Sequence, residues 1–256
     1  MIILSSNIID DSASVAQLTG NAGWAPRDWS VDPLAGGPFA RAYDGPRLGS
    51  DEERKDLIRQ KEKNHETNIE LARDYGFTPY HQGSTNFCWA NATTMLVEFL
   101  RCRQGLGRVP LSAASVACVV TEFRNVGGWC KQALDIIAKQ GAVPQEEWPA
   151  NAIDRRLNTA KTVASRKKYR VTEYDDIEPR DSRLLIDYLI LCGPVATARM
   201  FWRHATLAMD AVILKDGSIG TIEYNSGYGR DNNGLTILAG SRVTPDECVG
   251  IRSVTA

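Results

Sequence analysis

The 256-residue sequence predicts an α+β protein in which a helical lobe precedes a lobe of antiparallel strands. Between residues 88 and 144, apolar side chains recur at three- and four-residue spacing, which is typical of buried helices. After residue 193 the pattern changes to short apolar or alternating runs separated by Gly, Asp and Asn, which indicate strands. With 43% hydrophobic and 24% charged residues, the chain can form one large domain or two small ones.

Residues 1–75 are expected to form an N-terminal extension. Residues 1–49 are rich in Gly, Pro, Asp and Ser and predict mostly loop, with a short strand at 2–4. Residues 51–75 carry dense charges of both signs and a thin apolar stripe, which predicts a solvated helix with His65 on the surface. An ordered extension of this kind must dock on something, either its own domain or a partner.

The rest of the chain divides into a mainly helical lobe, residues 76–170, and a mainly β lobe, residues 171–256. The helices are predicted at residues 88–101, 111–123, 127–144 and 184–193, with Ser112, Gly141 and Gly193 as their stop or start signals. The strands are predicted at residues 194–200, 204–214, 218–226, 234–241 and 248–254. Residues 151–170, which are basic and precede an acidic stretch, are interpreted as a solvated linker, with a nucleic-acid patch as the alternative.

Charge and cysteine usage exclude several classes of protein. A formal net charge of -1 favours neither nucleic acid nor an anionic membrane as partner. Apolar runs are far shorter than ~18 residues, so no membrane span is expected, and the first residues make a poor signal peptide. No Cys-x-x-Cys pair occurs, and Cys102, Cys118 and Cys192 are expected as buried free thiols, which favours a reducing setting over classical secretion.

Cys88 lies where a Gly/Ser/Thr/Asn stretch meets the first predicted helix of the helical lobe. A free thiol with a pKa of ~8.5 is a poor nucleophile at neutral pH, and both a helix N-terminus and an imidazolium favour its anion. Gln82 can add an amide donor to the backbone N–H groups of the turn. His204 opens an apolar strand and Asn225 ends another, so the two can supply a base and a group that orients its ring.

Each of these residues also has a plainer interpretation. Cys88 can be core packing, His204 a buried core histidine and Asn225 a turn residue. His81 is the alternative base nearest to Cys88 in sequence. No Cys/His spacing fits a zinc site, and no metal or cofactor is expected.

The residues in order resemble the papain-like cysteine proteases. The segment QGSTNFCWA, residues 82–90, matches the family's Gln-Gly-Ser-x-x-x-Cys-Trp-Ala motif with its spacing intact. Further matches follow in the family's order over residues 76–256: Leu111-Ser112, Gly127-Gly128-Trp129, His204-Ala205 and Asn225-Ser226. The resemblance implies a two-lobed fold, with the nucleophile on the helical lobe, the base on a β-barrel-like lobe and the substrate cleft between them.

The resemblance also implies a role for each residue. Cys88 is expected as nucleophile, His204 as base and acid, Asn225 as orienter of the ring, and Gln82 as oxyanion donor. Gly127, Gly128 and Trp129 are expected to line the substrate site, where an extended peptide can pair with the backbone.

The chain departs from the family pattern at four points. Thr85 and Val126 stand where a disulfide is usual, and Gly227 stands where a Trp shields the His–Asn bond, with Tyr228 as a candidate replacement. That bond is therefore expected to be wetter. The connection before His204 is short, which predicts a more open cleft, and residues 51–75 lack the helical signature of the usual inhibitory propeptide.

Two functions follow from the sequence. The first is a peptidase that hydrolyses peptide or isopeptide bonds through a thioester on Cys88, with peptides or proteins as substrates. The second is a weak or inactive papain-like domain that serves a larger assembly, such as a virion, and docks through residues 1–75. A cleft filled by that extension favours a latent or structural role, and an open cleft favours an active enzyme.

Overall fold

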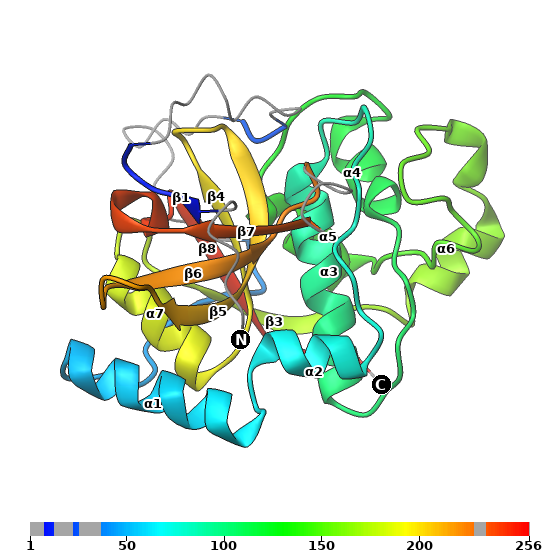
Figure 1. The fold of residues 1–256 in the computed structure, drawn as a ribbon. Helices are drawn as coiled ribbons and strands as arrows, with labels where there is room; N and C mark the ends of the chain where they lie inside the picture. The colour runs from blue at the N-terminus through cyan, green and yellow to red at the C-terminus, as the bar shows by residue number, and fades with distance from the viewer. Residues whose placement is uncertain (1–7, 13–22, 26–36, 228–233, 256) are drawn as a thin grey trace.

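A computed structural model, which describes residues 8–12, 23–25, 37–227 and 234–255, contains one curved sheet with helices on both faces (Figure 1). The strands are β1 (Ile8–Ile9), β2 (Ala40–Ala42), β3 (Val171–Asp176), β4 (Val195–Arg199), β5 (His204–Ile213), β6 (Ile219–Tyr224), β7 (Leu235–Leu238) and β8 (Glu247–Val254). The helices are α1 (Asp51–Asn64), α2 (Asn68–Asp74), α3 (Cys88–Arg103), α4 (Ala113–Thr121), α5 (Cys130–Lys139), α6 (Ala160–Arg166) and α7 (Ser182–Leu191), with 3-10 turns η3 (Arg155–Leu157) and η5 (Gly240–Val243).

Within the described residues, the strands follow the order β1-β7-β6-β5-β4-β8-β3-β2 across the sheet. The six strands from β7 to β3 in this order pair antiparallel, as short connected strands with alternating burial predict. Both edge strands come from the N-terminal extension and pair parallel, β1 with β7 and β2 with β3. β5 lies at the centre and begins at His204.

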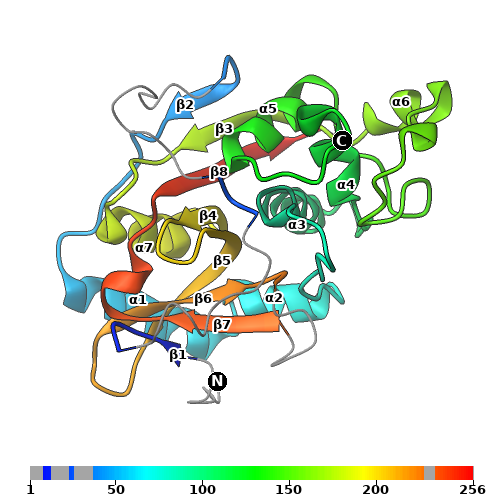
Figure 2. The same cartoon turned by 90° about the horizontal axis from the view of Figure 1, so that it is seen from above.

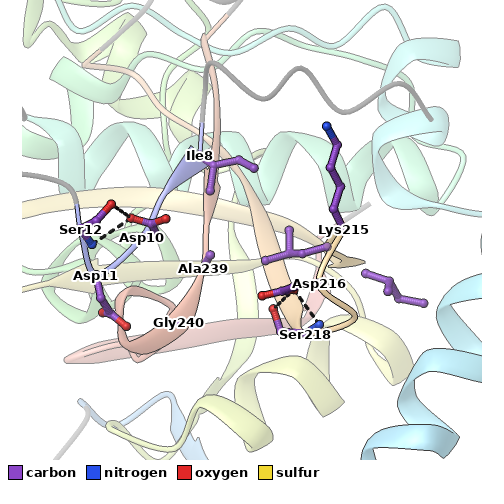
Figure 3. A pocket seen from close by; sticks show the side chains of 11 residues that line it. Ile8, Asp10, Asp11, Ser12, Lys215, Asp216, Ser218, Ala239 and Gly240 are labelled. Atoms are coloured by element: carbon purple, nitrogen blue, oxygen red, sulfur yellow. Dashed lines mark hydrogen bonds between the residues drawn. The ribbon is translucent and has the colours of Figure 1, made fainter.

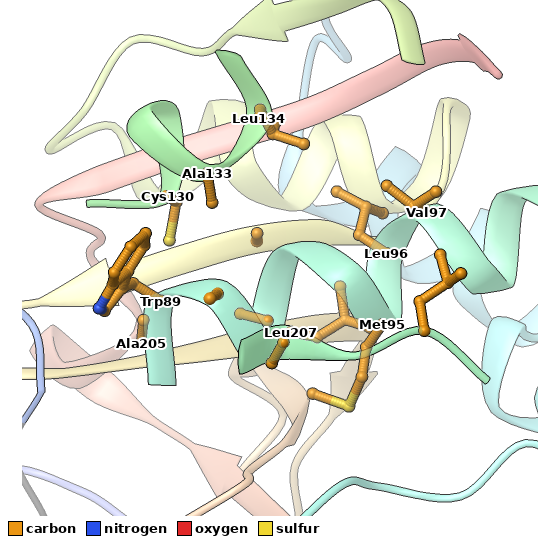
Figure 4. Close-up of a cluster of buried hydrophobic side chains, with 14 of the residues drawn as sticks. Trp89, Met95, Leu96, Val97, Cys130, Ala133, Leu134, Ala205 and Leu207 are labelled. Atoms are coloured by element: carbon orange, nitrogen blue, oxygen red, sulfur yellow. The ribbon is translucent and has the colours of Figure 1, made fainter. Parts of the chain in front are cut away.

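One face of the sheet packs on α3, which is buried along nearly its whole length. Figure 2 shows α3 nearly end-on, with β4, β5 and β6 on one side and α4 on the other. Met95 and Leu96 of α3, Leu207 of β5 and Leu134 of α5 belong to this core (Figure 4). The opposite face is covered by α7, against which α1 packs. Cover on both faces explains why β4 and β5 are buried along nearly their whole length rather than at alternate residues.

The described part of the extension docks on the chain's own β lobe. Arg54 of α1 forms a bidentate ion pair with Asp187 of α7, with Nε–Oδ1 2.7 Å and Nη2–Oδ2 3.0 Å, and both side chains are buried. Asp210 of β5 accepts hydrogen bonds from the backbone N–H groups of Asn68 and Ile69, at the start of α2. The extension therefore forms part of the folded unit rather than a free arm.

The structure confirms most of the predicted elements and corrects two. The four predicted helices correspond to α3, α4, α5 and α7, and the five predicted strands to β4 through β8. Residues 51–75 form two helices rather than one, because His65 adopts a left-handed conformation with φ of 59° and ends α1. The predicted linker is wrong, since residues 151–170 contain η3 and α6. The strand expected at residues 2–4 lies outside the described residues.

All six cysteines are free thiols, so no other disulfide takes the place of the one that the resemblance led us to expect near Thr85 and Val126. Cys102 and Cys118 are buried as expected, and Cys192 is partly exposed. In the described ranges no helix has both the length and the apolar character that a membrane crossing requires.

Candidate active site

Cys88 is the first residue of α3, and its side chain is fully buried. Helices α1, α2, α4 and α7 begin with side-chain caps, from Ser50, Thr67, Ser112 and Asp181 respectively. The residue before Cys88 is Phe87, whose side chain makes no capping bond. The first N–H groups of α3 therefore point to the region of the thiol without a side-chain acceptor of their own.

His204 and Asn225 form a hydrogen-bonded pair, with Nε2 of the ring 2.8 Å from Oδ1 of the amide. Since an amide oxygen only accepts, the ring donates through Nε2–H, and Nδ1 is the basic nitrogen of the neutral ring. The amide is held in turn, because Gly227 N–H donates to Oδ1 at 2.9 Å and Nδ2 donates to Thr236 Oγ1 at 3.3 Å. The end of β6 and Thr236 of β7 thus fix the orientation of the His204 ring and its tautomer.

Cys88 lies close to the start of β5 at the N-terminal end of α3, where the backbone of Ala205 contacts its sulfur. Burial raises the pKa of the Cys88 thiol to about 11, although the backbone N–H groups of Ala205 and Gly23 point at the sulfur and favour its anion. Burial also lowers the pKa of His204 to about 4, against a weaker opposite effect of its bond to Asn225. In this conformation both groups are therefore neutral at pH 7.

Gln82 is buried and tied to the segment that follows Asn225. Its Oε1 accepts from Ser226 Oγ at 2.9 Å, and its backbone N–H donates to Ser226 O at 3.0 Å. Its side-chain nitrogen, which carries two hydrogens, donates to Thr85 O at 3.0 Å. The two lobes are thus joined directly at the residue expected as an oxyanion donor.

A short piece of the extension, residues 23–25, lies across the expected substrate site, and we call it the closing segment. Trp24 forms a parallel β-bridge with Gly128, with Gly128 N–H donating to Gly23 O at 3.1 Å and Ala25 N–H donating to Gly128 O at 3.3 Å. Trp129 Nε1 donates to Ala25 O at 2.8 Å. Gly127, Gly128 and Trp129 therefore hold an extended peptide, which belongs to the chain itself.

The closing segment fits too closely for a side chain at Gly23 or Gly127. A Cβ at Gly23 would lie 2.1 Å from Asn86 O, and a Cβ at Gly127 would lie 2.5 Å from Gly23 O. Both neighbours are backbone atoms, which cannot move aside as a side chain can. Glycine is required at these positions for the segment to lie this close to the turn before Cys88.

The Trp24 side chain is almost fully buried, with 1% of its surface exposed. Its Nε1 donates to Oε2 of Glu247 at 2.8 Å, and Glu247 is itself buried at the start of β8. The same carboxylate accepts from the backbone N–H groups of Cys130 at 3.1 Å and Lys131 at 2.9 Å, at the start of α5. Glu247 thus caps α5 from another element and binds the closing segment.

Comparison with known families bears directly on this arrangement. The profile described as papain family cysteine protease matches residues 73–234, which is more than half of the chain. The chain belongs to the papain family of cysteine proteases. The absence of disulfides marks it as a divergent papain-family member. A search of curated protein sequences gave no match.

Solved papain-fold structures resemble the chain at low sequence identity. Procathepsin L 3 from the larval midgut of Tenebrio molitor has a TM-score of 0.59 and 17% identity, over 69% of this chain and 66% of that chain. Xylellain from Xylella fastidiosa has a TM-score of 0.56 and 18% identity, over 70% and 83% respectively. Bromelain from Ananas comosus has a TM-score of 0.55 and 20% identity, over 70% and 95%. At this identity the likeness establishes the papain fold.

Two expectations about the papain-like cleft are wrong. The more open site is not observed, because the closing segment covers it and leaves Cys88 0% and His204 6% exposed. The His204–Asn225 bond is not wetter for the missing Trp, since Asn225 is 0% exposed and the Trp202 ring packs edge-on against His204 at 5.5 Å. Tyr228, the candidate replacement, lies outside the described residues.

The other histidines lie apart from this arrangement. His81 is exposed, and its Nδ1 accepts from Gly83 N–H at 3.0 Å within the loop. His65 is exposed beside Glu70, with Nδ1 2.9 Å from Oε1. His204 is therefore the histidine that the fold brings to the start of α3.

Trp24 and Glu247 are the residues that sequence reasoning missed. A Gly-Trp pair in a loop-rich extension and a Glu at the start of an apolar strand carry no local signal of function. Only the hydrogen bond between Trp24 and Glu247 in the folded chain indicates that the two residues belong to the site.

A hollow of about 610 Å³ lies elsewhere, between β1 and the β5–β6 turn (Figure 3). None of the candidate catalytic or substrate-binding residues lines it. Its carboxylates already accept local hydrogen bonds, as Asp11 does from Ser241 and Asp216 from Ser218. We assign no chemistry to this hollow.

Proposed function

We propose that the chain is a cysteine peptidase that hydrolyses peptide or isopeptide bonds, with Cys88 as nucleophile, His204 as base and acid, and Asn225 as the residue that orients the ring. The observation that carries this proposal is the 2.8 Å bond between His204 Nε2 and Asn225 Oδ1 beside a thiol at a helix start without a side-chain cap. Membership of the papain family supports it.

In the proposed reaction, His204 Nδ1 accepts the Cys88 proton and the sulfur attacks the carbonyl carbon of the scissile bond. The oxyanion of the tetrahedral intermediate accepts from the Cys88 backbone N–H and the Gln82 amide. Collapse of the intermediate breaks the C–N bond, and His204 returns its proton to the leaving amine. Water, deprotonated by His204, then hydrolyses the thioester and restores the thiol.

We further propose that the closed conformation is a latent form. A site whose thiol has a pKa of about 11 and whose imidazole has a pKa of about 4 contains almost no thiolate at neutral pH. The closing segment presents the N–H of Gly23 to the sulfur rather than a carbonyl carbon. The segment therefore occupies the site without placing a cleavable bond at the sulfur. Its departure would admit water and move both pKa values back towards their ordinary range.

The second candidate, a permanently closed component of a larger assembly, is favoured by the same closing segment. In that case the segment never leaves, and the thiol is simply buried. Docking of such a component through residues 1–75 would use faces of the extension that do not pack on the β lobe. The two candidates differ in whether Cys88 becomes reactive once the segment is displaced.

The test uses Gly23→Val, because a side chain at this position must collide with the backbone of Asn86 and displace the segment. The rate of Cys88 alkylation by iodoacetamide is measured against pH, and the labelled peptide is identified by mass spectrometry. We expect slow labelling below about pH 10 in the wild type and fast labelling near pH 6–7 in Gly23→Val.

Two further variants complete this experiment. Gly49→Ala is the matched control, since its added Cβ would lie 3.5 Å from its nearest neighbour, an ordinary contact. The fast labelling of Gly23→Val should be lost when His204→Ala is added, because the imidazolium no longer supports the thiolate. An ordinary thiol pKa in a folded Gly23→Val protein contradicts the peptidase and supports the assembly component.

A further inference from the structure

We propose that a second hollow, at the outer edge of the helical lobe, binds a small molecule through its phosphate group, with the Arg166 guanidinium as the main ligand. This α6 hollow, of about 270 Å³, lies between helix α6 and the C-terminal ends of α4 and α5 (Figure 1). Its lining includes Glu122, Phe123, Gln140, Arg155, Val163 and Arg166. None of the candidate catalytic or substrate-binding residues lines it, so the inference is independent of the proposed peptidase function.

Arg166 is a buried cation with donors that the fold does not use. It is the last residue of α6, and only 2% of its surface is exposed. Its Nη1 donates to Oε1 of Gln140 at 3.0 Å. Its Nε and Nη2 are buried and have no hydrogen-bond partner among the described residues. An unmet donor on a buried charged group is costly, so these two nitrogens require a partner from outside the described chain.

Arg54, which is also buried, shows which partner these two nitrogens take elsewhere in the molecule. Its Nε and Nη2 donate to the two carboxylate oxygens of Asp187, at 2.7 Å and 3.0 Å. The N–H groups on this edge of a guanidinium form a planar fork that matches two oxygens of a carboxylate or a phosphate. The bond to Asp187 raises the pKa of Arg54, whereas burial lowers the pKa of Arg166. Arg166 therefore presents the same fork without the anion.

The groups around the hollow do not fill this fork. Glu122 is the acid among the described lining residues, but it is exposed, and its carboxylate makes no bond to Nε or Nη2 of Arg166. The last carbonyl groups of α4 and α5 are the other possible acceptors, since helix C-termini attract cations. If Arg166 served only to neutralise these helix ends, its free nitrogens would donate to such carbonyls, and neither does so.

A second cation at the hollow favours phosphate over a carboxylate. Arg155 is exposed, and its guanidinium is held over the Phe123 ring at 4.7 Å and donates to the backbone oxygen of Glu122 at 3.2 Å. Residues 151–170 as a whole carry seven Lys and Arg residues and one Asp. A phosphate monoester has a charge of about −1.5 to −2 at pH 7 and three acceptor oxygens. Two oxygens can occupy the Arg166 fork, and the remaining charge is matched by Arg155.

The size of the hollow limits the rest of the ligand. Its 270 Å³ is just below the range of about 300–1,000 Å³ that is usual for small-molecule pockets. A phosphate group therefore fits with a small organic body but not with a large one. Phe123 and Val163, which is 41% exposed, give the hollow an apolar side for such a body. Free phosphate and small phosphate esters share the chemistry that Arg166 recognises.

The experiment is a calorimetric titration of the full chain at pH 7 with inorganic phosphate and with glycerol 3-phosphate, at an ionic strength held constant with sodium chloride. The wild type should bind at one site. Arg166→Lys keeps the charge but loses the fork, so its Kd should rise by about 10-fold. Arg155→Gln, at an exposed position, should raise the Kd by about 3-fold. Tighter binding of glycerol 3-phosphate identifies an ester as the ligand, and equal binding identifies free phosphate.

Lys161→Gln is the matched control. Lys161 is exposed on the same helix and does not line the hollow, so this variant removes one positive charge of the basic segment without touching the fork. Its Kd for phosphate should stay within about 2-fold of the wild-type value, because salt screens exposed charges.

Absence of binding to the folded wild type, or an equal loss in Lys161→Gln and Arg166→Lys, would overturn the inference. Succinate that binds as tightly as phosphate would contradict the choice of phosphate. An oligonucleotide that binds more tightly than either phosphate compound and loses affinity equally in both lysine variants would indicate a nucleic-acid patch instead. Arg166→Met gives a second measurement, because the rise in Tm that phosphate causes in the wild type should be absent from it. An equal rise in both proteins contradicts the site, and the titration of Arg166→Lys decides if Arg166→Met does not fold.

Discussion

Helices α3 and α5 both begin with a fully buried cysteine, Cys88 and Cys130, yet their surroundings give the two thiols different chemistry. Burial raises the pKa of both. At α5 the carboxylate of Glu247 takes the first backbone N–H groups, and its charge raises the pKa of Cys130 further. At α3 no side chain caps the helix, and the N–H groups of Ala205 and Gly23 favour the anion of Cys88.

The comparison shows that a position at a helix start does not by itself favour the anion of a thiol. The helix start helps only when its N–H groups remain available to an anion, and a built-in carboxylate removes that help. His204 lies near the start of α3 because β5 begins there. Within the described part of the chain, no histidine is among the groups that shift the pKa of Cys130. The predictions below test this difference.

The largest expected effect is on catalysis. In the Gly23→Val background, Cys88→Ala should lower kcat/KM for a peptide substrate by at least about 10⁴-fold, because the nucleophile is lost. Cys130→Ala should stay within about 3-fold, since its thiol faces Glu247 rather than the reacting atoms. Comparable losses in both variants, measured with the same fluorogenic peptide, would contradict the distinction between the two helices.

The next effect is the contribution of His204 to the pH dependence of the free energy of unfolding. Its pKa is about 4 in the folded chain and about 6.5 when unfolded, so the unfolded state binds more protons between these values. Stability should be fully present above pH 6.5 and fall by about 3 kcal/mol as pH falls to 4. The check is urea unfolding at pH 7 and 4.5, in wild type and His204→Gln.

The difference between these two proteins isolates His204 from other buried groups. Asp210, whose pKa burial raises to about 6, acts in the opposite direction, because its folded form gains protons as pH falls through that value. An equal loss of stability in both proteins would mean that His204 already has an ordinary pKa.

A smaller loss of activity is expected when the ring is no longer oriented. Asn225→Ala in the Gly23→Val background removes the acceptor for Nε2–H, and kcat should fall by about 10- to 100-fold. Thr236→Val, which removes only the hydroxyl that accepts from the Asn225 amide, should have a weaker effect of the same kind. An unchanged pH–rate profile in Asn225→Ala would mean that the bond has no part in setting the tautomer.

The smallest effect concerns the helix starts themselves. Glu247→Ala removes an acceptor shared by two N–H groups of α5 and should destabilise the chain by about 1–3 kcal/mol. Ser112→Ala removes the local cap of α4 and should cost about 1 kcal/mol. Urea unfolding at pH 7 gives both values. A smaller loss for Glu247→Ala than for Ser112→Ala would indicate that α5 does not depend on this carboxylate.

Local patterns in the sequence predict the helices, most strands and the identity of the candidate residues. Ser112 caps α4 and Gly141, with φ of 89°, ends the α5 region, because caps and left-handed glycines act within a few residues. The order of Cys88, His204 and Asn225 along the chain also indicates the papain family, which the family match confirms. Their roles in catalysis stay predictions.

Contacts between distant segments could not be predicted from the sequence. β3 carries Glu173, Asp175 and Asp176 and looks like an acidic loop, yet Asp175 accepts from the buried Tyr188 hydroxyl and Asp176 pairs with Lys131. In the sequence, Glu247 is an acidic residue at a strand end. In the structure it pairs with Ala198 and its carboxylate contacts the start of α5. No periodic pattern marks three residues of the extension as the cover of a site more than sixty residues further along the chain.

The two edge strands, β1 and β2, hold the chain on either side of the closing segment. The chain leaves β1 at one edge of the sheet, passes over Cys88 and reaches β2 at the other edge, so the segment is anchored on both sides. Its rebinding is intramolecular, with an effective concentration on the order of millimolar for a short tether. Opening is then a unimolecular equilibrium that dilution leaves unchanged. A soluble peptide must compete against this local concentration. A single cut on one side would leave the segment tethered on the other, so cuts on both sides are needed to let it dissociate.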